Sequence, residues 1–596
     1  MSWESFNRIA AKYRHEGILI ATAIIAFVLV WPVGEYGILD DWAFVKSLEH
    51  LHVSGKLVVL DWNPMSLTGH LFWGLAFTKL LGFSFLATKI SVFVAGVLVS
   101  LIVYWYARRH GANPQLAFVA GMGLLLNPLF FVHIFMYMTD VTGLFWQWLS
   151  IWCLSIGLAR NDRWKSSLLA AGSVFWAMAF LTRQHGITVP LALGAYILLF
   201  DRSLFRWRIL APAYLPGVWV TVNGLYWHAV VQPNNRSFQA SSELVRQFLL
   251  DPPWANLPYI LFSFAVYVGL FVAPVALAVR WKGLFNLTRI SQILVFVACW
   301  LGISYWTHAS MRGWYFPYCR NVVTPSGFFE PFAFAVWAMP QLWEREWGIA
   351  VGLLGVIAAL VWILCLGSWV SEPRTTDGPT DRRGFAVRLV LLLLVFQLGY
   401  CFATAPILFD RHLLLLAPSA IVLAALMVQA DNSPRWSVSL LILGGYACYA
   451  VPCAHDIHAV SRAVFLEGVR LHATGVPVDK IDAGYAFDGW FMYEKSFAIS
   501  PPSPVILPPW WPEPVKVYGS DVEHPWWVYE LVTAIEPEYV VTASTPVPAF
   551  MYRGKYRYEE VPTERTYQTY WPWAEHKVQV FRCIPAISSV PEKPRG

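Results

Sequence analysis

The sequence predicts a polytopic α-helical membrane protein that carries a small α/β domain outside the membrane. Composition predicts the membrane part, because 57% of the 596 residues are hydrophobic and only 13% are charged, whereas soluble domains average about 25% charged residues. The mean hydropathy of +0.50 agrees with this class. A change in composition predicts the second part, because residues 455–596 are richer in proline, tyrosine and charge than residues 1–454.

Length, charge and cysteine content exclude several other classes. The net charge of +6 is modest, and no run of consecutive basic residues indicates a nucleic-acid partner. Eight cysteines are scattered singly, mostly within apolar runs, so no disulfide framework is predicted. The first apolar run, residues 17–34, lacks a small-residue cleavage site and is interpreted as a retained first span.

Apolar runs of the length needed to cross a bilayer recur along the chain. We identify about 13 candidate transmembrane helices of roughly 20 residues, near residues 17–34, 84–106, 115–135, 141–159, 166–182, 186–200, 209–230, 258–279, 290–307, 348–370, 386–405, 412–430 and 436–454. Lysine and arginine are denser in the connections that a cytoplasmic N-terminus places inside the cell, which predicts that orientation. The odd count then places the C-terminal domain outside.

One stretch leaves the count open. The segment "GFFEPFAFAVWAMPQLW" (327–343) is apolar enough for a short span or a re-entrant piece. We place it in an external loop, because counting it as a span would put the arginine-bearing loop "SEPRTTDGPTDRRG" outside, against the positive-inside rule.

The first external loop, residues 35–83, opens with two adjacent carboxylates, Asp40 and Asp41, in "GILDDWAFVKSLEHLHVSG". Apolar residues then recur at helical spacing, which predicts an interfacial helix that keeps the carboxylates at the membrane surface. One of two adjacent carboxylates can act as a base or a metal ligand while the other orients it.

Other charged residues gather at predicted external span ends and not at mid-membrane depth, where ion-coupled transporters place theirs. Arginine binds phosphate through its planar fork of donors, and carboxylates bind divalent cations or activate hydroxyl groups. Within the spans, Lys89 and Arg388 lie near the ends, where long side chains can reach the surface. The residues at external ends are Asp140, Arg183, His185, Asp410, Arg411 and His412.

Four features of the chain together resemble the GT-C glycosyltransferases. They are the paired acids that open the first outer loop, the interfacial helix, a second acid after the third span and a late "DRHLLLLAP". The similar branch is that of the protein O-mannosyltransferases and the lipid A aminoarabinose transferase. The resemblance covers about residues 15–430 and implies a GT-C fold, interfacial helices in the first outer loop and a polyprenyl-phosphate-linked sugar donor. The tail resembles only the bacterial members, and loosely.

The resemblance also implies roles for the acids. Asp40 matches the essential acid of the family's Asp-Glu motif, and Asp41 stands where the glutamate is usual. Asp140 matches the second acid. These three carboxylates are the catalytic candidates, and they are also the ligands of a divalent metal such as Mg, Mn or Zn if the enzyme uses one, which the sequence does not decide.

The basic residues follow from the same resemblance. Arg411 matches the arginine that contacts the lipid phosphate, and His412 replaces the tyrosine of that motif. Arg183 falls where relatives keep a basic residue at the donor site, and His185 accompanies it. Relatives often carry Lys-Pro-Pro in the first loop, but this chain reads "DWNPMSLTGHLFWG", which leaves Asn63 and His70 as substitute substrate-binding candidates.

A further candidate binding segment is "RGWYFPYCRN" (312–321), in which Arg312 and Arg320 accompany aromatic residues suited to a sugar or a lipid. The tail holds three strand-like pieces, "KIDAGYAF", "EYVVTAS" and "KVQVFRC", which predict a small α/β domain.

We therefore expect an inverting glycosyltransferase in a bacterial inner membrane, with its C-terminal domain in the periplasm. The acceptor is left open among protein, lipid and glycan. The alternatives are a transporter or lipid flippase, and a non-catalytic membrane protein that binds glycan.

Overall fold

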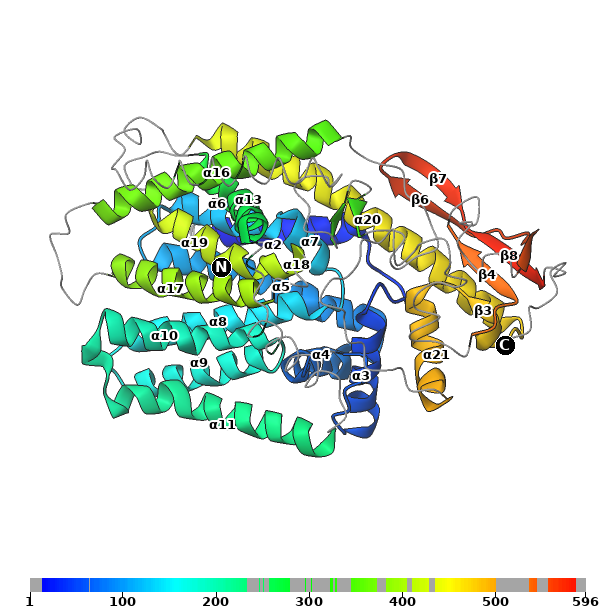
Figure 1. The fold of residues 1–596 in the computed structure, drawn as a ribbon, viewed down its shortest axis with the longest axis horizontal. Helices are drawn as coiled ribbons and strands as arrows, with labels where there is room; N and C mark the ends of the chain where they lie inside the picture. Colours follow the sequence, from blue (N-terminus) through cyan, green and yellow to red (C-terminus); the bar gives the residue numbers. More distant parts are fainter. Residues whose placement is uncertain are drawn as a thin grey trace, which may run out of the picture.

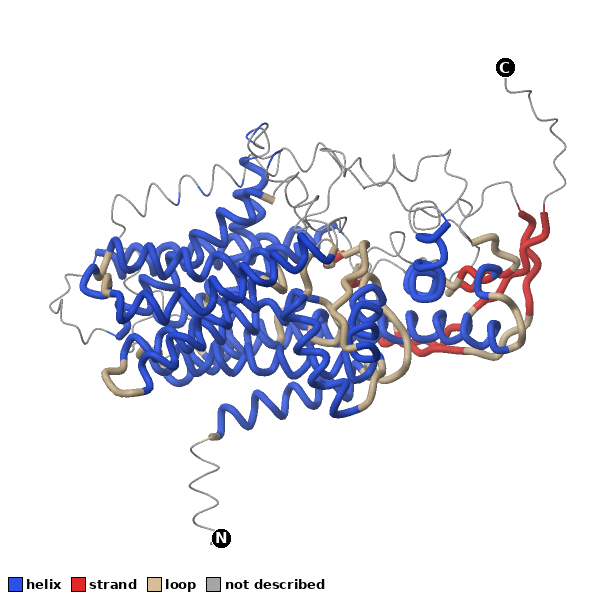
Figure 2. Tube along the Cα trace, turned by 90° about the horizontal axis from the view of Figure 1, so that it is seen from below, coloured by secondary structure: helices blue, strands red, loops and turns tan. Residues whose placement is uncertain are grey.

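The computed structural model describes residues 13–63, 65–232, 257–278, 322–324, 327–329, 345–371, 382–404, 410–427, 435–499, 535–543 and 556–585, with isolated positions between 246 and 302. Long helices lie side by side along the longest axis, and the strands of the C-terminal part lie beyond one end of them (Figures 1 and 2).

Six helical stretches of the described residues are long and apolar enough to cross a membrane. They are α5 (Phe85–Arg109), α8 (Thr139–Ala159), residues Ala350–Gly367 of α16 (Arg345–Ser371), α17 (Arg382–Ala403), the continuous stretch Asp410–Met427 and α20 (Trp436–Ala473). The membrane class is thus confirmed, whereas the predicted number of spans and their orientation stay predictions.

Other apolar helices complete the helical body. They are α2 (Arg14–Val30), α6 (Pro114–Leu125), α7 (Pro128–His133), α9 (Trp164–Phe180), α10 (Thr188–Leu199), α11 (Trp207–Val231) and α13 (Leu257–Ala276). The predicted span near 115–135 is divided into α6 and α7. Asn127 accepts a hydrogen bond from the Leu129 amide and Pro128 follows it, which is a strong helix-start signal.

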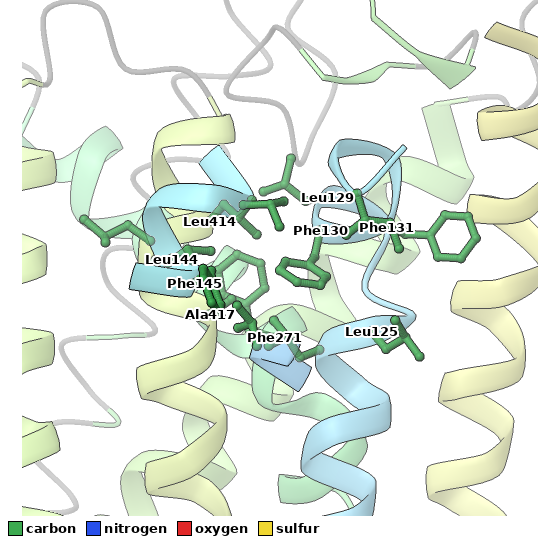
Figure 3. Close-up of a cluster of buried hydrophobic side chains, with 14 of the residues drawn as sticks. Leu125, Leu129, Phe130, Phe131, Leu144, Phe145, Phe271, Leu414 and Ala417 are labelled. Carbon is green, nitrogen blue, oxygen red and sulfur yellow. The ribbon is translucent and has the colours of Figure 1, made fainter. Parts of the chain in front are cut away.

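The hydrophobic core continues up to the residues that begin α8. Figure 3 shows Phe130 and Phe131 of α7, Phe145 of α8 and Phe271 of α13 in one cluster with Leu414 and other apolar side chains. Phe130, Phe131 and Leu416 have no exposed surface. Tight packing of this kind restricts the adjoining helix starts, which carry Asp140 and Arg411.

The first loop forms two helices, α3 (Asp41–Ser54) and α4 (Thr68–Leu81), and α3 runs across the ends of the long helices (Figure 1). The predicted amphipathic helix is α3, and its apolar residues Phe44, Leu48 and Leu51 are buried. Gly55 ends α3 with φ of 68°, a left-handed conformation that glycine adopts without a steric penalty.

The chain leaves the helical body through α20, which passes without a break through residues 454 and 455 (Figure 1). It leads to β3 (Ile481–Asp482) and α21 (Tyr485–Ile499). A four-stranded sheet has the order β3-β4-β8-β5, with β3 parallel to β4 and the other pairs antiparallel.

The remaining strands of this part are β4 (Tyr539–Thr542), β5 (Tyr556–Val561), β6 (Thr566–Tyr570), β7 (Trp573–Lys577) and β8 (Gln579–Pro585). The β6 and β7 strands form a separate hairpin. Two of the three strand-like sequence pieces contain β4 and most of β8, so their strand prediction is confirmed. In the first piece only Ile481 and Asp482 form a strand, β3, because α21 begins at Tyr485. A short hairpin, β1 (Val323–Thr324) with β2 (Gly327–Phe328), lies earlier in the chain.

Candidate active site

Asp40 lies directly before α3 and receives contacts from three distant parts of the chain. The Tyr485 hydroxyl of α21 and the Trp62 indole, at 3.2 Å, both donate hydrogen bonds to Oδ1. The Arg411 guanidinium lies 3.8 Å from Oδ2. The Asp40 side chain keeps 21% of its surface exposed. Its first oxygen is therefore fixed, while the second faces a cation at a partly open site.

Asp41, its neighbour, is fully buried and points elsewhere. Its Oδ1 accepts a hydrogen bond of 2.6 Å from the Ile38 amide, which closes the turn that leads into α3. Burial raises the pKa of the Asp41 carboxyl to about 8, and Lys89 opposes this effect. The structure therefore separates the two adjacent carboxylates, because only Asp40 has surface that a substrate could reach.

Asp140 begins α8 and forms a compact ion pair with Arg183, which precedes the short helix η1 (Gln184–Ile187). Arg183 Nη1 lies 2.6 Å from Asp140 Oδ1, and the two side chains are 11% and 5% exposed. The same Nη1 donates to the Thr139 hydroxyl at 3.1 Å. Asp140 Oδ2 is buried, with no hydrogen-bond partner among the described residues. A carboxylate oxygen in this position could accept a proton or a hydrogen bond from a bound molecule.

The predicted basic residues come together around this pair. His412 lies within electrostatic range of Arg411, Arg183, Asp140 and His185. A Cβ on Gly143, one turn into α8, would lie 3.5 Å from His185 Nε2, so the His185 ring lies against the start of this helix. Four cationic or imidazole side chains from two distant segments, together with His133 of α7, therefore lie within electrostatic range of the buried Asp140.

Asp410, next to Arg411, has a structural task. It is fully buried, and its carboxylate accepts hydrogen bonds from the Val322, Val323 and Arg411 amides at 2.8–3.2 Å. These bonds attach the β1–β2 hairpin to the start of α18 (Asp410–Leu413) and fix the direction in which Arg411 leaves the chain.

Two substitute candidates of the first loop are buried in the fold. Asn63 donates to the Ala43 carbonyl and the Ser47 hydroxyl and holds the loop against α3. His70 bonds the Thr142 hydroxyl at 3.1 Å, and its ring packs 4.0 Å from that of Tyr137. Burial lowers the pKa of His70 to about 3, so the ring is neutral at physiological pH. Arg312 and Arg320 lie outside the described residues.

Sequence reasoning missed two features of the site. Tyr485 comes from the C-terminal part, and neither spacing nor a motif connects it with Asp40, 445 residues earlier. Lys89 was expected to reach the membrane surface, and this prediction is wrong. It is fully buried, and its ammonium donates to the Tyr36 carbonyl at 3.0 Å and lies 3.3 Å from the centroid of that ring.

The positions predicted for a metal are not assembled into a metal-binding group in the part of the chain that the structure describes. No cluster of three or more His, Cys, Asp or Glu side chains with suitable geometry occurs there. Asp40 and Asp140 each pair with a different arginine, and Asp41 turns away from both.

Comparison with known proteins gives one family match. Residues 70–227 match the family model described as dolichyl-phosphate-mannose-protein mannosyltransferase. This segment includes Asp140, Arg183 and His185. A comparison with curated proteins finds no match.

Two solved structures are similar over almost the whole chain, at low identity. ArnT from Cupriavidus metallidurans in the apo state is 13% identical with a TM-score of 0.42, covering 95% of this chain and 97% of that one. The structure of the same protein bound to undecaprenyl phosphate is 14% identical with a TM-score of 0.41, covering 96% of this chain and 99% of that one. The resemblance to the GT-C membrane glycosyltransferases is confirmed by the family match over residues 70–227.

Proposed function

We propose that the protein is an integral-membrane glycosyltransferase that transfers a sugar from a polyprenyl-phosphate donor to an acceptor on the periplasmic face of a bacterial inner membrane. The observation that carries this proposal is the partly exposed pair of Asp40 and Arg411. Their side chains come from positions far apart in the sequence and meet at 3.8 Å, at a partly open site. A carboxylate beside an arginine suits a reaction in which a hydroxyl loses a proton and a phosphate leaves.

In the proposed reaction, the acceptor oxygen attacks the anomeric carbon and forms the new C–O bond. The bond from that carbon to the donor phosphate breaks, and the polyprenyl phosphate leaves as a monoester. Asp40 takes the proton of the acceptor hydroxyl. Because attack and departure occur on opposite faces of the sugar, a single step of this kind inverts the anomeric configuration.

The phosphate would bind beside Arg411, with Arg183 and the imidazoles of His412 and His185 behind it. Arg183 is already neutralised by Asp140 at 2.6 Å, so it contributes less charge than Arg411. Donors fixed in advance are effective because they need not reorganise when charge develops on the leaving phosphate. Asp140 would then orient Arg183 and offer its second oxygen to the bound substrates.

Asp41 would act as a positioning residue. Its bond to the Ile38 amide shapes the turn that presents Asp40, and its burial keeps it from contact with the substrate. If a divalent metal takes part, Asp40 and Asp140 are the carboxylates available to it, and the metal would help neutralise the phosphate.

The two alternatives predict different distributions of charge and different behaviour. A transporter or flippase would move its lipid or ion without consuming the donor, and a glycan-binding protein would tolerate loss of Asp40. The location of the acid and base groups at helix starts, beside the loop helices α3 and α4, favours chemistry at the membrane surface.

The test is sugar transfer from a panel of labelled polyprenyl-phosphate sugars by the full-length protein in membranes. Wild type is compared with Asp40→Asn, each with and without a chelator. We expect one donor to be consumed by wild type, and transfer to be lost in Asp40→Asn. Loss on chelation would add a metal to the mechanism. Equal transfer by Asp40→Asn, or no consumption of any donor, would reject the proposal.

A further inference from the structure

The β6–β7 hairpin is attached along α20 by two buried carboxylates. Asp456 of α20 accepts hydrogen bonds from the Tyr570 amide at 2.7 Å and the Trp571 amide at 3.0 Å, at the tip of the hairpin. Eleven residues further along α20, Glu467 binds Arg565 Nε and the Thr563 hydroxyl, each at 3.0 Å, at the hairpin's base. These two attachments fix the direction of the hairpin along the helix.

In this direction, the tip of the β6–β7 hairpin points back toward the membrane. An α20 of 38 residues is about 57 Å long, whereas the hydrocarbon core of a bilayer is about 30 Å thick. Its first half, residues 436–454, has no charged side chain, and Leu440 and Leu441 are 62% and 76% exposed there. The membrane boundary therefore falls near His455 and Asp456, which is where the tip is attached.

The tip is aromatic, ordered and exposed. Trp571 and Trp573 are 43% and 75% exposed. The Tyr570 ring stacks on His455 at a centroid distance of 3.6 Å, and the Trp573 ring stacks on Tyr570 at 5.5 Å. Stacked rings fix the tryptophan orientation before any partner binds, so less side-chain entropy is lost on binding.

We propose that this tip is a membrane anchor, with Trp571 and Trp573 seated among the phospholipid headgroups where α20 leaves the bilayer. Tryptophan favours this layer because its ring is apolar while its N–H remains hydrogen-bonded. The anchor would hold the C-terminal strands, and with them α20 and α21, at a set height above the membrane. A sugar could stack on the same rings, but the depth of the tip and the apolar surface of α20 beside it favour lipid.

The test is photo-crosslinking of the full-length protein in vesicles of phosphatidylethanolamine and phosphatidylglycerol. A benzophenone amino acid replaces Trp573 in one variant and Lys577 in a matched control. Both positions belong to the exposed face of β7, but Lys577 lies at the base, about 13 Å further along the strand.

After illumination, we expect severalfold more phospholipid adduct from position 573 than from position 577. The same probe at Trp571 should also label lipid, which guards against an unproductive orientation at 573. Equal labelling at 573 and 577, or no lipid adduct from either tip position, would each overturn the proposal.

Discussion

The two carboxylate–arginine pairs near the starts of α3 and α8 differ in geometry. Asp140 and Arg183 are 2.6 Å apart and almost entirely buried, whereas Asp40 and Arg411 are 3.8 Å apart and each about one fifth exposed. A buried pair is hard to break because either partner alone is left as an uncompensated charge. A partly exposed pair at this longer distance contributes little to stability. The first pair therefore supports the fold, and the second leaves its atoms available to a substrate.

Removing Arg183, the cation of the buried pair, should have the largest effect on stability. We expect Arg183→Met to lower the free energy of unfolding by about 3–5 kcal/mol, because Asp140 remains buried and charged. Thermal unfolding in detergent and sugar transfer are the measurements. The double variant Asp140→Asn/Arg183→Met should regain most of the stability but not the transfer. A single variant as stable as wild type would contradict the assignment of a structural role to this pair.

Removing Arg411, the cation of the partly exposed pair, should lower activity while stability stays nearly unchanged. We expect Arg411→Gln to lower the rate of transfer about 100-fold, because a charged donor to the leaving phosphate is lost. Its unfolding free energy should change by less than about 1 kcal/mol. Arg411→Lys should lie between, since it keeps the charge but not the planar fork. A loss of stability as large as that of Arg183→Met would erase the distinction between the two pairs.

A smaller effect is expected from removing the Tyr485 hydroxyl, which donates a hydrogen bond to Asp40. Tyr485→Phe removes one donor to Oδ1 and should lower kcat about tenfold with little change in donor KM. A variant that keeps the wild-type kcat would show that Tyr485 does not position Asp40.

The matched control for this experiment is Tyr493→Phe. Tyr493 lies about two turns further along α21 and packs on Trp42, with 5.3 Å between ring centroids. This variant loses the same atom from the same helix, so an equal fall in kcat in both variants would count against positioning by Tyr485.

The smallest effect on transfer is expected at Asp41. Burial raises the pKa of its carboxyl to about 8, so the folded protein retains a proton that the unfolded chain releases above pH 4. Stability of wild type should therefore fall as pH rises from about 4 to about 8. Asp41→Asn should show less of this decline and keep transfer within about twofold. Thermal unfolding of both proteins at pH 5 and pH 8 measures the change in stability. An Asn variant without transfer activity at both pH values would assign Asp41 to the chemistry.

Local patterns determined a large part of what the structure contains. Short stretches of sequence are enough to predict three kinds of element. They are the apolar helix α5 with Ser84 as its cap, the amphipathic helix α3, and the strands β4 and β8. Their causes are local too, since capping, amphipathicity and alternation depend on residues a few positions apart.

Tertiary structure decided which of these residues meet. Asp40 and Asp41 are identical and adjacent in the sequence, yet Asp40 is partly exposed beside Arg411, whereas Asp41 is buried and accepts a hydrogen bond from the Ile38 amide. Tyr485 reaches Asp40 because α21 packs on α3, and the hairpin tip is held against α20 because Asp456 accepts a hydrogen bond from the Trp571 amide. The sequence by itself determined the membrane class and the chemical types at the helix starts. Burial and pairing over hundreds of residues depend on how the helices pack, and no local pattern encodes that packing.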